Sequence, residues 1–318
     1  MLFHVKTLIR LIASLGLVGL VLWFVDPLRV LGALGRPDPL WLGAGFAAAL
    51  CATLASALRW RLLALWLEAR APGRLFLLAY WRGIAANTVL PGGTLGGDAL
   101  RALHLQQAGN PLTASAMSVA LDRISGLWVL VVISLATAAL ALATGLMPAT
   151  VLPLPWPAAA LLALLAVIAP LLLWQLSAAA RHRLPGKLAG LLDAIHDRPR
   201  PLRQYLLQLA GSALVQALSI LAFAGGGLAV GLALPLWLYF IAAGPIFILA
   251  ALPVSVGGWG TREAAAALTL GLFGAPRELA VAAAILYGLF AALQGLLGAL
   301  TLLHPIHGSA SHLENHDA

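Results

Sequence analysis

Long apolar runs, separated by short segments that carry most of the charges, dominate the pattern of this chain. Six runs are long enough for a helix to cross about 30 Å of hydrocarbon. They lie at residues 8–25, 40–58, 113–143, 157–177, 205–231 and 279–303. A helix satisfies its own backbone hydrogen bonds in lipid, where no water is present to do so. The pattern therefore predicts an all-α integral membrane protein with six full transmembrane helices.

Two pairs of shorter apolar pieces lie between these crossings. The first pair is 76–90 with 98–109, and the second is 236–252 with 261–273. Helix-breaking residues separate the members of each pair: Pro91, Gly92, Gly93, Gly96 and Gly97 in the first, and Pro253, Gly257, Gly258 and Gly260 in the second. Irregular backbone at membrane depth is tolerated only where it is buried in protein or lines a polar cavity. We therefore expect two re-entrant helical hairpins beside such a cavity.

The order of these elements divides the chain into two similar halves. Residues 1–143 and residues 157–303 each contain two crossings, a hairpin and a further crossing. Three complete crossings is an odd number, so the second half enters the membrane in the opposite orientation. We expect a single polytopic domain, 1–303, built as an inverted repeat whose hairpins meet near the centre of the membrane. A short polar tail, 304–318, follows.

Composition excludes an ordinary soluble domain. Hydrophobic residues make up 62% of the 318 residues and charged residues only 9%, with a mean hydropathy of +0.97. A net charge of +8 would also suit a nucleic-acid-binding protein, but the basic residues lie in short loops between apolar runs. That distribution is typical of membrane orientation, so we expect no nucleic-acid partner.

The basic residues also predict which way the chain is oriented. The N-terminal segment and the loops 59–75 and 178–204 carry most of the Lys and Arg, and Arg59 opens the first of these loops. Loops rich in Lys and Arg stay in the cytoplasm. A hairpin at 76–109, rather than a crossing, keeps all three segments on one side. We therefore expect both termini, including the tail, to be cytoplasmic.

Six charged residues fall within the apolar regions, where each is unfavourable unless it is paired or hydrated. They are Asp98, Arg101, Asp122, Arg123, Arg262 and Glu263. Three acids balance three arginines, so one interpretation is a set of internal ion pairs that hold the two halves together. The other is a substrate-binding cavity in which the arginines compensate a phosphate or carboxylate, while the acids orient them or exchange protons. Asn87, at the first break, would contact the substrate or cap the backbone.

Local geometry gives three further expectations. Asp122 and Arg123 point about 100° apart on a helix, so we expect one to address the first hairpin and the other the second. Arg82 lies near the end of a short apolar piece, and its long stem would let the charge reach the membrane surface. The single cysteine, Cys51, sits in an apolar run and is expected to be a buried, structural thiol.

Recognisable catalytic motifs are absent from the sequence. The glycines at 92–97 are not followed by Lys-Ser or Lys-Thr, so they do not form a phosphate-binding loop. There is no nucleophile elbow and no histidine-rich metal set within an apolar run. The sequence therefore favours a protein that is not an enzyme, with no catalytic residue, metal or cofactor.

Three ordered motifs carry a resemblance to a known family. They are Asn87, Leu90, Pro91, Gly92, Gly93, Gly96, Gly97, Asp98 and Arg101; then Leu121, Asp122, Arg123 and Gly126; then Pro253, Gly257, Gly258, Gly260, Arg262 and Glu263. In these positions the chain resembles the membrane region of lysylphosphatidylglycerol synthases, a flippase-like family, over about residues 8–303. The two-domain members also have a soluble aminoacyl-transferase domain, which this sequence lacks after Pro305. Aminoacylation is therefore not expected.

The resemblance implies a multi-pass protein of the bacterial cytoplasmic (inner) membrane. It also implies a lipid flippase, or translocator, that moves an anionic or lipid-linked head group through a central polar cavity. A membrane lipid or lipid-linked molecule would be its substrate. The alternative is an accessory membrane subunit that does not transport, and that presents lipid to a partner enzyme such as a glycosyltransferase. The sequence does not settle the oligomeric state.

Overall fold

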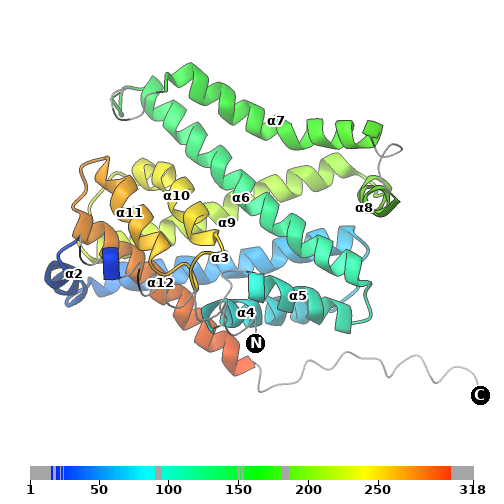
Figure 1. The fold of residues 1–318 in the computed structure, drawn as a ribbon, viewed down its shortest axis with the longest axis horizontal. Coiled ribbons are helices and arrows are strands. Elements are labelled where there is room, and N and C mark those ends of the chain that lie inside the picture. Colours follow the sequence, from blue (N-terminus) through cyan, green and yellow to red (C-terminus); the bar gives the residue numbers. More distant parts are fainter. Residues whose placement is uncertain are drawn as a thin grey trace, which may run out of the picture.

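The computed structural model is all-helical throughout the residues that it describes (Figure 1). These are residues 25–89, 95–148, 154–180 and 186–301, with residues 16, 19–21, 23 and 151. The first predicted crossing, 8–25, and the polar tail lie almost entirely outside this part of the chain. Helix numbering accordingly begins with α2.

Within the described residues, five helices are long and apolar enough to cross a membrane, and each coincides with a predicted crossing. They are α3 (Pro39–Trp66), α6 (Leu112–Ala143), α7 (Trp156–Ala180), α9 (Pro201–Ala229) and α12 (Arg277–Leu300). The chain is therefore a multi-pass membrane protein. The largest difference from the sequence-based boundaries is at the end of α3, which continues for two turns beyond residue 58. Arg59 thus lies in a membrane-spanning helix, and placing it in a loop was wrong.

Both pairs of shorter helices are present. α4 (Gly73–Val89) packs against α5 (Leu95–Gln107), and α10 (Leu236–Ala251) packs against α11 (Thr261–Gly271). Gly96 and Gly97 belong to the first turn of α5, so they do not interrupt the helix, while Pro91, Gly92 and Gly93 lie outside the described residues.

The turn between α10 and α11 contains the second set of predicted breaks, and it is fully described. Gly257, Gly258 and Gly260 all have positive φ angles, of 58°, 76° and 85°. Residues with a side chain rarely adopt this backbone conformation, so glycine at these positions lets the chain reverse direction tightly. The membrane depth that this turn reaches stays a prediction.

Two short helices that hydropathy did not indicate lie in connecting segments. α2 (Pro27–Leu34) precedes α3, and α8 (Gly186–His196) precedes α9. The Asp26 carboxylate accepts a hydrogen bond from the backbone N–H of Leu28 at the start of α2 (3.0 Å), and the Asp38 carboxylate caps α3 in the same way through Leu40 (2.8 Å).

The most extensive helix contact is between α3 and α9 in the middle of the bundle, while α7 lies at its outside against α6 (Figure 1). Glycines allow the central contact: a Cβ atom on Gly225 would lie 2.7 Å from the Cα of Gly45. Small residues of this kind let two membrane helices approach closely. Cys51, also on α3, is exposed, so the expectation of a buried thiol was wrong.

Candidate functional site

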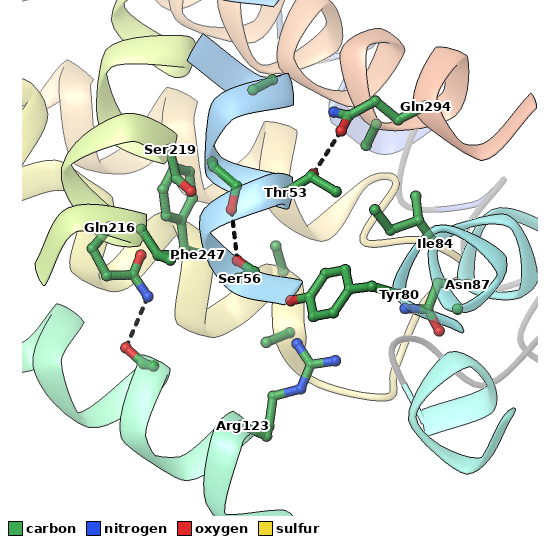
Figure 2. A pocket seen from close by; sticks show the side chains of 18 of the residues that line it. Thr53, Ser56, Tyr80, Ile84, Asn87, Arg123, Gln216, Ser219, Phe247 and Gln294 are labelled. Carbon is green, nitrogen blue, oxygen red and sulfur yellow. Dashed lines mark hydrogen bonds between the residues drawn. The ribbon is translucent and has the colours of Figure 1, made fainter. Parts of the chain in front are cut away.

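A cavity of about 340 Å³ lies where the two helix pairs meet α3, α6, α9 and α12. Six of the seven predicted site residues line it: Asn87, Asp98, Arg101, Asp122, Arg123 and Arg262. The seventh, Glu263, is buried behind Arg262. Figure 2 shows the side of the cavity in which Arg123 points inward beneath Tyr80. The structure therefore brings six of these residues together around one cavity, and their role in binding stays a prediction.

Asp122, on α6, is the centre of the charged part of the cavity. Its side chain is only 1% exposed and accepts hydrogen bonds from two arginines on different helices. Arg59 of α3 donates from Nε to Oδ1 at 2.9 Å, and Arg101 of α5 donates from Nη2 to Oδ2 at 2.7 Å. One carboxylate therefore ties three helices together.

The chain of charges continues from Arg101 to the edge of the cavity. Arg101 Nη1 donates to Asp98 Oδ1 at 3.3 Å. Asp98 in turn accepts two hydrogen bonds from Arg123, from Nε to Oδ2 at 3.0 Å and from Nη2 to Oδ1 at 2.8 Å. Nη1 of Arg123 has no hydrogen-bond partner among the described residues. In order of contact, this charge chain consists of Arg59, Asp122, Arg101, Asp98 and Arg123, whose charges alternate in sign.

Exposure increases towards the end of this chain. The side chains of Arg59, Asp122 and Arg101 are at most 6% exposed, whereas Asp98 is 14% and Arg123 is 34% exposed. Three arginines and two aspartates leave one positive charge uncompensated within the chain. All five members line the cavity, and Arg123 is the most exposed of them.

Aromatic rings hold the middle arginine in place. The guanidinium of Arg101 lies 4.3 Å from the ring centroid of Trp60 and 4.4 Å from that of Tyr80. Trp60 is itself fixed by a hydrogen bond from its indole N–H to Ser118 Oγ at 3.0 Å. Such cation–π contacts stabilise a cation that has lost its water, as Arg101 has here.

Arg59 is a site residue that the sequence interpretation did not identify. Besides Asp122, its guanidinium donates to Ser212 Oγ of α9 at 2.8 Å. Two glycines make room for it: a Cβ on Gly126 would lie 3.2 Å from Nη1, and one on Gly211 would lie 3.2 Å from Cγ. Arg59 also continues a stripe of small buried residues along α3, which is the signal that could have placed it in the bundle.

The expectation that Asp122 and Arg123 address different hairpins was wrong. Both bind residues of α5, Asp122 through Arg101 and Arg123 through Asp98. α5 lies alongside α6, so two side chains that diverge by about 100° still meet residues three positions apart on it. Of the two helix pairs, only the first therefore supplies partners to these residues, and Arg59 of α3 is the further partner of Asp122.

The second pair of helices contributes a separate ion pair. Arg262 donates from Nε and Nη2 to Glu263 Oε1, at 3.1 and 2.7 Å, and both side chains are buried. Glu263 Oε2 accepts the backbone N–H of Gly260 at 2.6 Å, which fixes the start of α11. A Cβ on Gly288 would lie 2.1 Å from Arg262 Nη2, so α12 has glycine where the guanidinium passes.

Asn87 acts on the backbone. Its side-chain Oδ1 accepts the N–H of Gly97 at 2.7 Å and thereby caps the first turn of α5. The helices are so close here that a Cβ on Gly97 would lie 2.2 Å from the carbonyl oxygen of Gly83. Of the two roles expected for Asn87, the contact with the backbone is the one seen.

Arg82 was expected to extend its charge to the membrane surface, and in the structure this charge is bound by protein groups at the end of α12. It is 5% exposed and donates to the backbone oxygen and the hydroxyl of Thr301, directly after α12, and it also contacts His104 Nε2 at 3.2 Å. A cation at the C-terminal end of a helix is favoured because the free carbonyl groups point towards it.

The remaining wall of the cavity is uncharged and mixed in character. Thr53 donates to Gln294 Oε1 at 2.6 Å, and Gln216 donates to the backbone oxygen of Gly126 at 2.8 Å (Figure 2). Phe247 and Phe290 lie among these polar groups. A molecule with a charged end and an apolar body would therefore find both kinds of contact.

The helices and the cavity define a class of protein: a polytopic, all-helical membrane protein with a charged cavity inside the bundle. The chain belongs to the family described as the lysylphosphatidylglycerol synthase TM region, whose profile matches residues 8–298. That match confirms the resemblance to this family and covers the membrane part only. No match was found among curated proteins.

Proposed function

We propose that the protein is a lipid translocator that moves an anionic or lipid-linked molecule across the membrane, with the head group passing through the central cavity. The observation that carries this proposal is the alternating chain of five charges, which ends at Arg123. Because this charge chain has three arginines and two aspartates, one positive charge remains, and Arg123 is its most exposed member. A phosphate is the group that best complements an arginine with a free N–H edge.

The lining of the cavity supports an amphiphilic substrate. Charged groups gather on α5 and α6, while Phe247, Phe290 and the neutral polar groups of Thr53, Gln216 and Gln294 also line the cavity. The head group would bind Arg123, and the apolar body would remain against the aromatic side or in the lipid. Membership in a family of membrane domains fits a lipid-related role.

The pattern of helix contacts supports an inverted repeat, which alternating access to such a cavity would use. α4 packs against α12 and α10 packs against α6, so each helix pair contacts the last crossing of the other half. α5 packs against α6 as α11 packs against α12, and α3 meets α9 at the centre. The short helices α2 and α8 also precede α3 and α9. Exchanging the two halves leaves this pattern unchanged.

The proposal is tested by reconstituting the protein in vesicles that contain phosphatidylglycerol labelled on an acyl chain with a fluorophore that dithionite reduces. Dithionite added outside reduces label in the outer leaflet, so a translocator makes inner-leaflet label accessible as well. We expect the protein to accelerate this second phase. We also expect Arg123→Gln to slow it about tenfold or more, since a hydrogen bond to a charged group contributes about 1.5–3 kcal/mol.

The matched control is Arg36→Gln, which removes the same charge from an exposed residue between α2 and α3 and should leave the rate unchanged. Wild-type protein that binds the lipid but does not accelerate its movement would overturn translocation in favour of an accessory role. Equal rates for wild type and Arg123→Gln would overturn the role of this arginine.

A further inference from the structure

A second cavity, of about 350 Å³, lies at one end of the contact between α3 and α9. We call it the α3–α9 groove. It is lined by Trp66, Pro199, Arg200, Arg203, Gln204 and Leu207, and it shares no residue with the central cavity. Since α3 ends at Trp66 and α9 begins at Pro201, the groove lies where two apolar helices end. Tryptophan is enriched at this level, the interface between membrane and water.

Both arginines of the groove lack an acidic partner. Neither Arg200 nor Arg203 forms an ion pair with a described residue, although the adjacent Arg198 pairs with Glu68. No Asp or Glu is among the residues that line the groove. The two positive charges therefore remain uncompensated beside a cavity.

The other polar groups of the groove are also hydrogen-bond donors. The side chain of Gln204 is buried, at 6% exposure, and its Nε2 has no hydrogen-bond partner. α9 has no side-chain cap at its N-terminus, so the backbone N–H groups of its first turn are directed towards the same end. The carbonyl oxygen of Pro199 is engaged, because it accepts the indole N–H of Trp66 at 2.9 Å.

A site with several free donors and two cations without an acidic partner is complementary to an anion. A buried amide donor without a partner is unfavourable, and a ligand oxygen would remove that penalty. Leu207, one helical turn from Arg203 and 36% exposed, extends the groove with an apolar surface towards the middle of the helix. The ligand that matches both parts has a phosphate and an acyl chain.

We propose that the α3–α9 groove binds the phosphate of an anionic membrane phospholipid, with Arg200, Arg203 and the Gln204 amide as donors and the first acyl carbons against Leu207 and Trp66. This lipid is bound at a site separate from the central cavity, and the proposal does not depend on translocation. Basic pockets between helix ends are a known way for membrane proteins to hold anionic head groups.

The experiment uses photoactivatable phosphatidylglycerol with the purified full-length chain in a neutral detergent, and locates adducts by peptide mass spectrometry. We expect adducts at the groove, and a drop in yield of about fivefold for each of Arg200→Gln and Arg203→Gln. Gln204→Met should also lower the yield, and because it leaves the charge unchanged it separates hydrogen bonding from general attraction. Arg74→Gln, an exposed arginine at the start of α4, and Arg123→Gln in the central cavity should both retain the adducts.

Three controls define the ligand. A photoactivatable phosphatidylcholine should give few adducts at the groove, and an equal yield would overturn the preference for an anionic lipid. Inorganic phosphate at the same concentration should compete weakly, and full competition would show that the site takes free phosphate instead. Absence of groove adducts in wild type, or their persistence when Arg200 and Arg203 are both replaced, would overturn the site.

Discussion

The replacement Asp122→Asn is the most direct test of the charge chain. The change keeps the shape of the side chain but removes the negative charge that Arg59 and Arg101 share at 2.9 and 2.7 Å. Both arginines are buried, so water cannot replace the carboxylate. Removing one partner of a buried ion pair destabilises a protein by about 3–5 kcal/mol. We expect a loss of that size in the free energy of unfolding.

Asp98→Asn provides the internal comparison, because it removes the same charge from the outer part of the chain. Its main partner, Arg123, is 34% exposed and can be hydrated from the cavity. Exposed ion pairs contribute about 1 kcal/mol or less, and partial burial raises this only modestly. Asp122→Asn should therefore be the more destabilising change by about 2 kcal/mol or more. Glu278→Gln, whose partner Arg29 is 71% exposed, should have little effect.

Unfolding by sodium dodecyl sulfate in mixed micelles, followed by tryptophan fluorescence, measures these differences, because the chain has ten tryptophans. Combining Asp122→Asn with Arg101→Gln gives a double-mutant cycle, and residues in direct contact show coupling energies of about 0.5–3 kcal/mol. An unfolding free energy within about 1 kcal/mol of wild type for Asp122→Asn, or zero coupling to Arg101, would refute the view that this carboxylate holds the helices together.

Two further predictions concern the helix pairs. Gly97→Ala places a Cβ 2.2 Å from a backbone carbonyl oxygen of α4, which cannot rotate away. We therefore expect the free energy of unfolding in the same assay to fall by about 1–3 kcal/mol. Gly43→Ala, whose Cβ would have nothing within 4 Å, should be neutral or stabilising. In a Cys51→Ala background, single cysteines at the exposed positions Leu95 and Val254 should react with a membrane-impermeant reagent from opposite sides of the membrane. Labelling of both from the same side would contradict opposed hairpins.

Hydropathy located the crossings well because most residues of each long helix are apolar. Four of the five long helices in the described part of the chain begin and end within about four residues of the predicted runs. The exception, α3, continues from residue 58 to Trp66 through Arg59. A hydropathy window scores a buried, paired arginine as it scores a hydrated one in a loop. Arg59 is stable inside the bundle because it pairs with Asp122, which is 63 residues away in sequence and outside any hydropathy window.

The sequence indicated most of the charged residues that line the cavity, but it did not indicate Arg59 or which residues pair. Charged residues next to helix breaks in an apolar chain were expected to gather at a cavity, and sequence position selected Asp98, Arg101 and Arg262 in this way but not Arg59. Which arginine meets which carboxylate depends on how α5 lies against α6, and nothing in the local sequence encodes that approach. The role of Asn87 depends on the same approach, because its acceptor meets Gly97 only when α4 and α5 are in close contact.

The two interpretations of the buried charges, structural ion pairs and a binding site, apply to different members of one chain. In an alternating chain that begins and ends with arginine, each acid is shared between two cations, and one unit of charge must remain. Burying that charge inside the bundle would be strongly unfavourable, so the stable place for it is the end that water or a ligand can reach. The interior members, Asp122 and Arg101, are therefore expected to affect folding when changed. Arg123 is expected to affect binding and movement of an anion while the fold is retained.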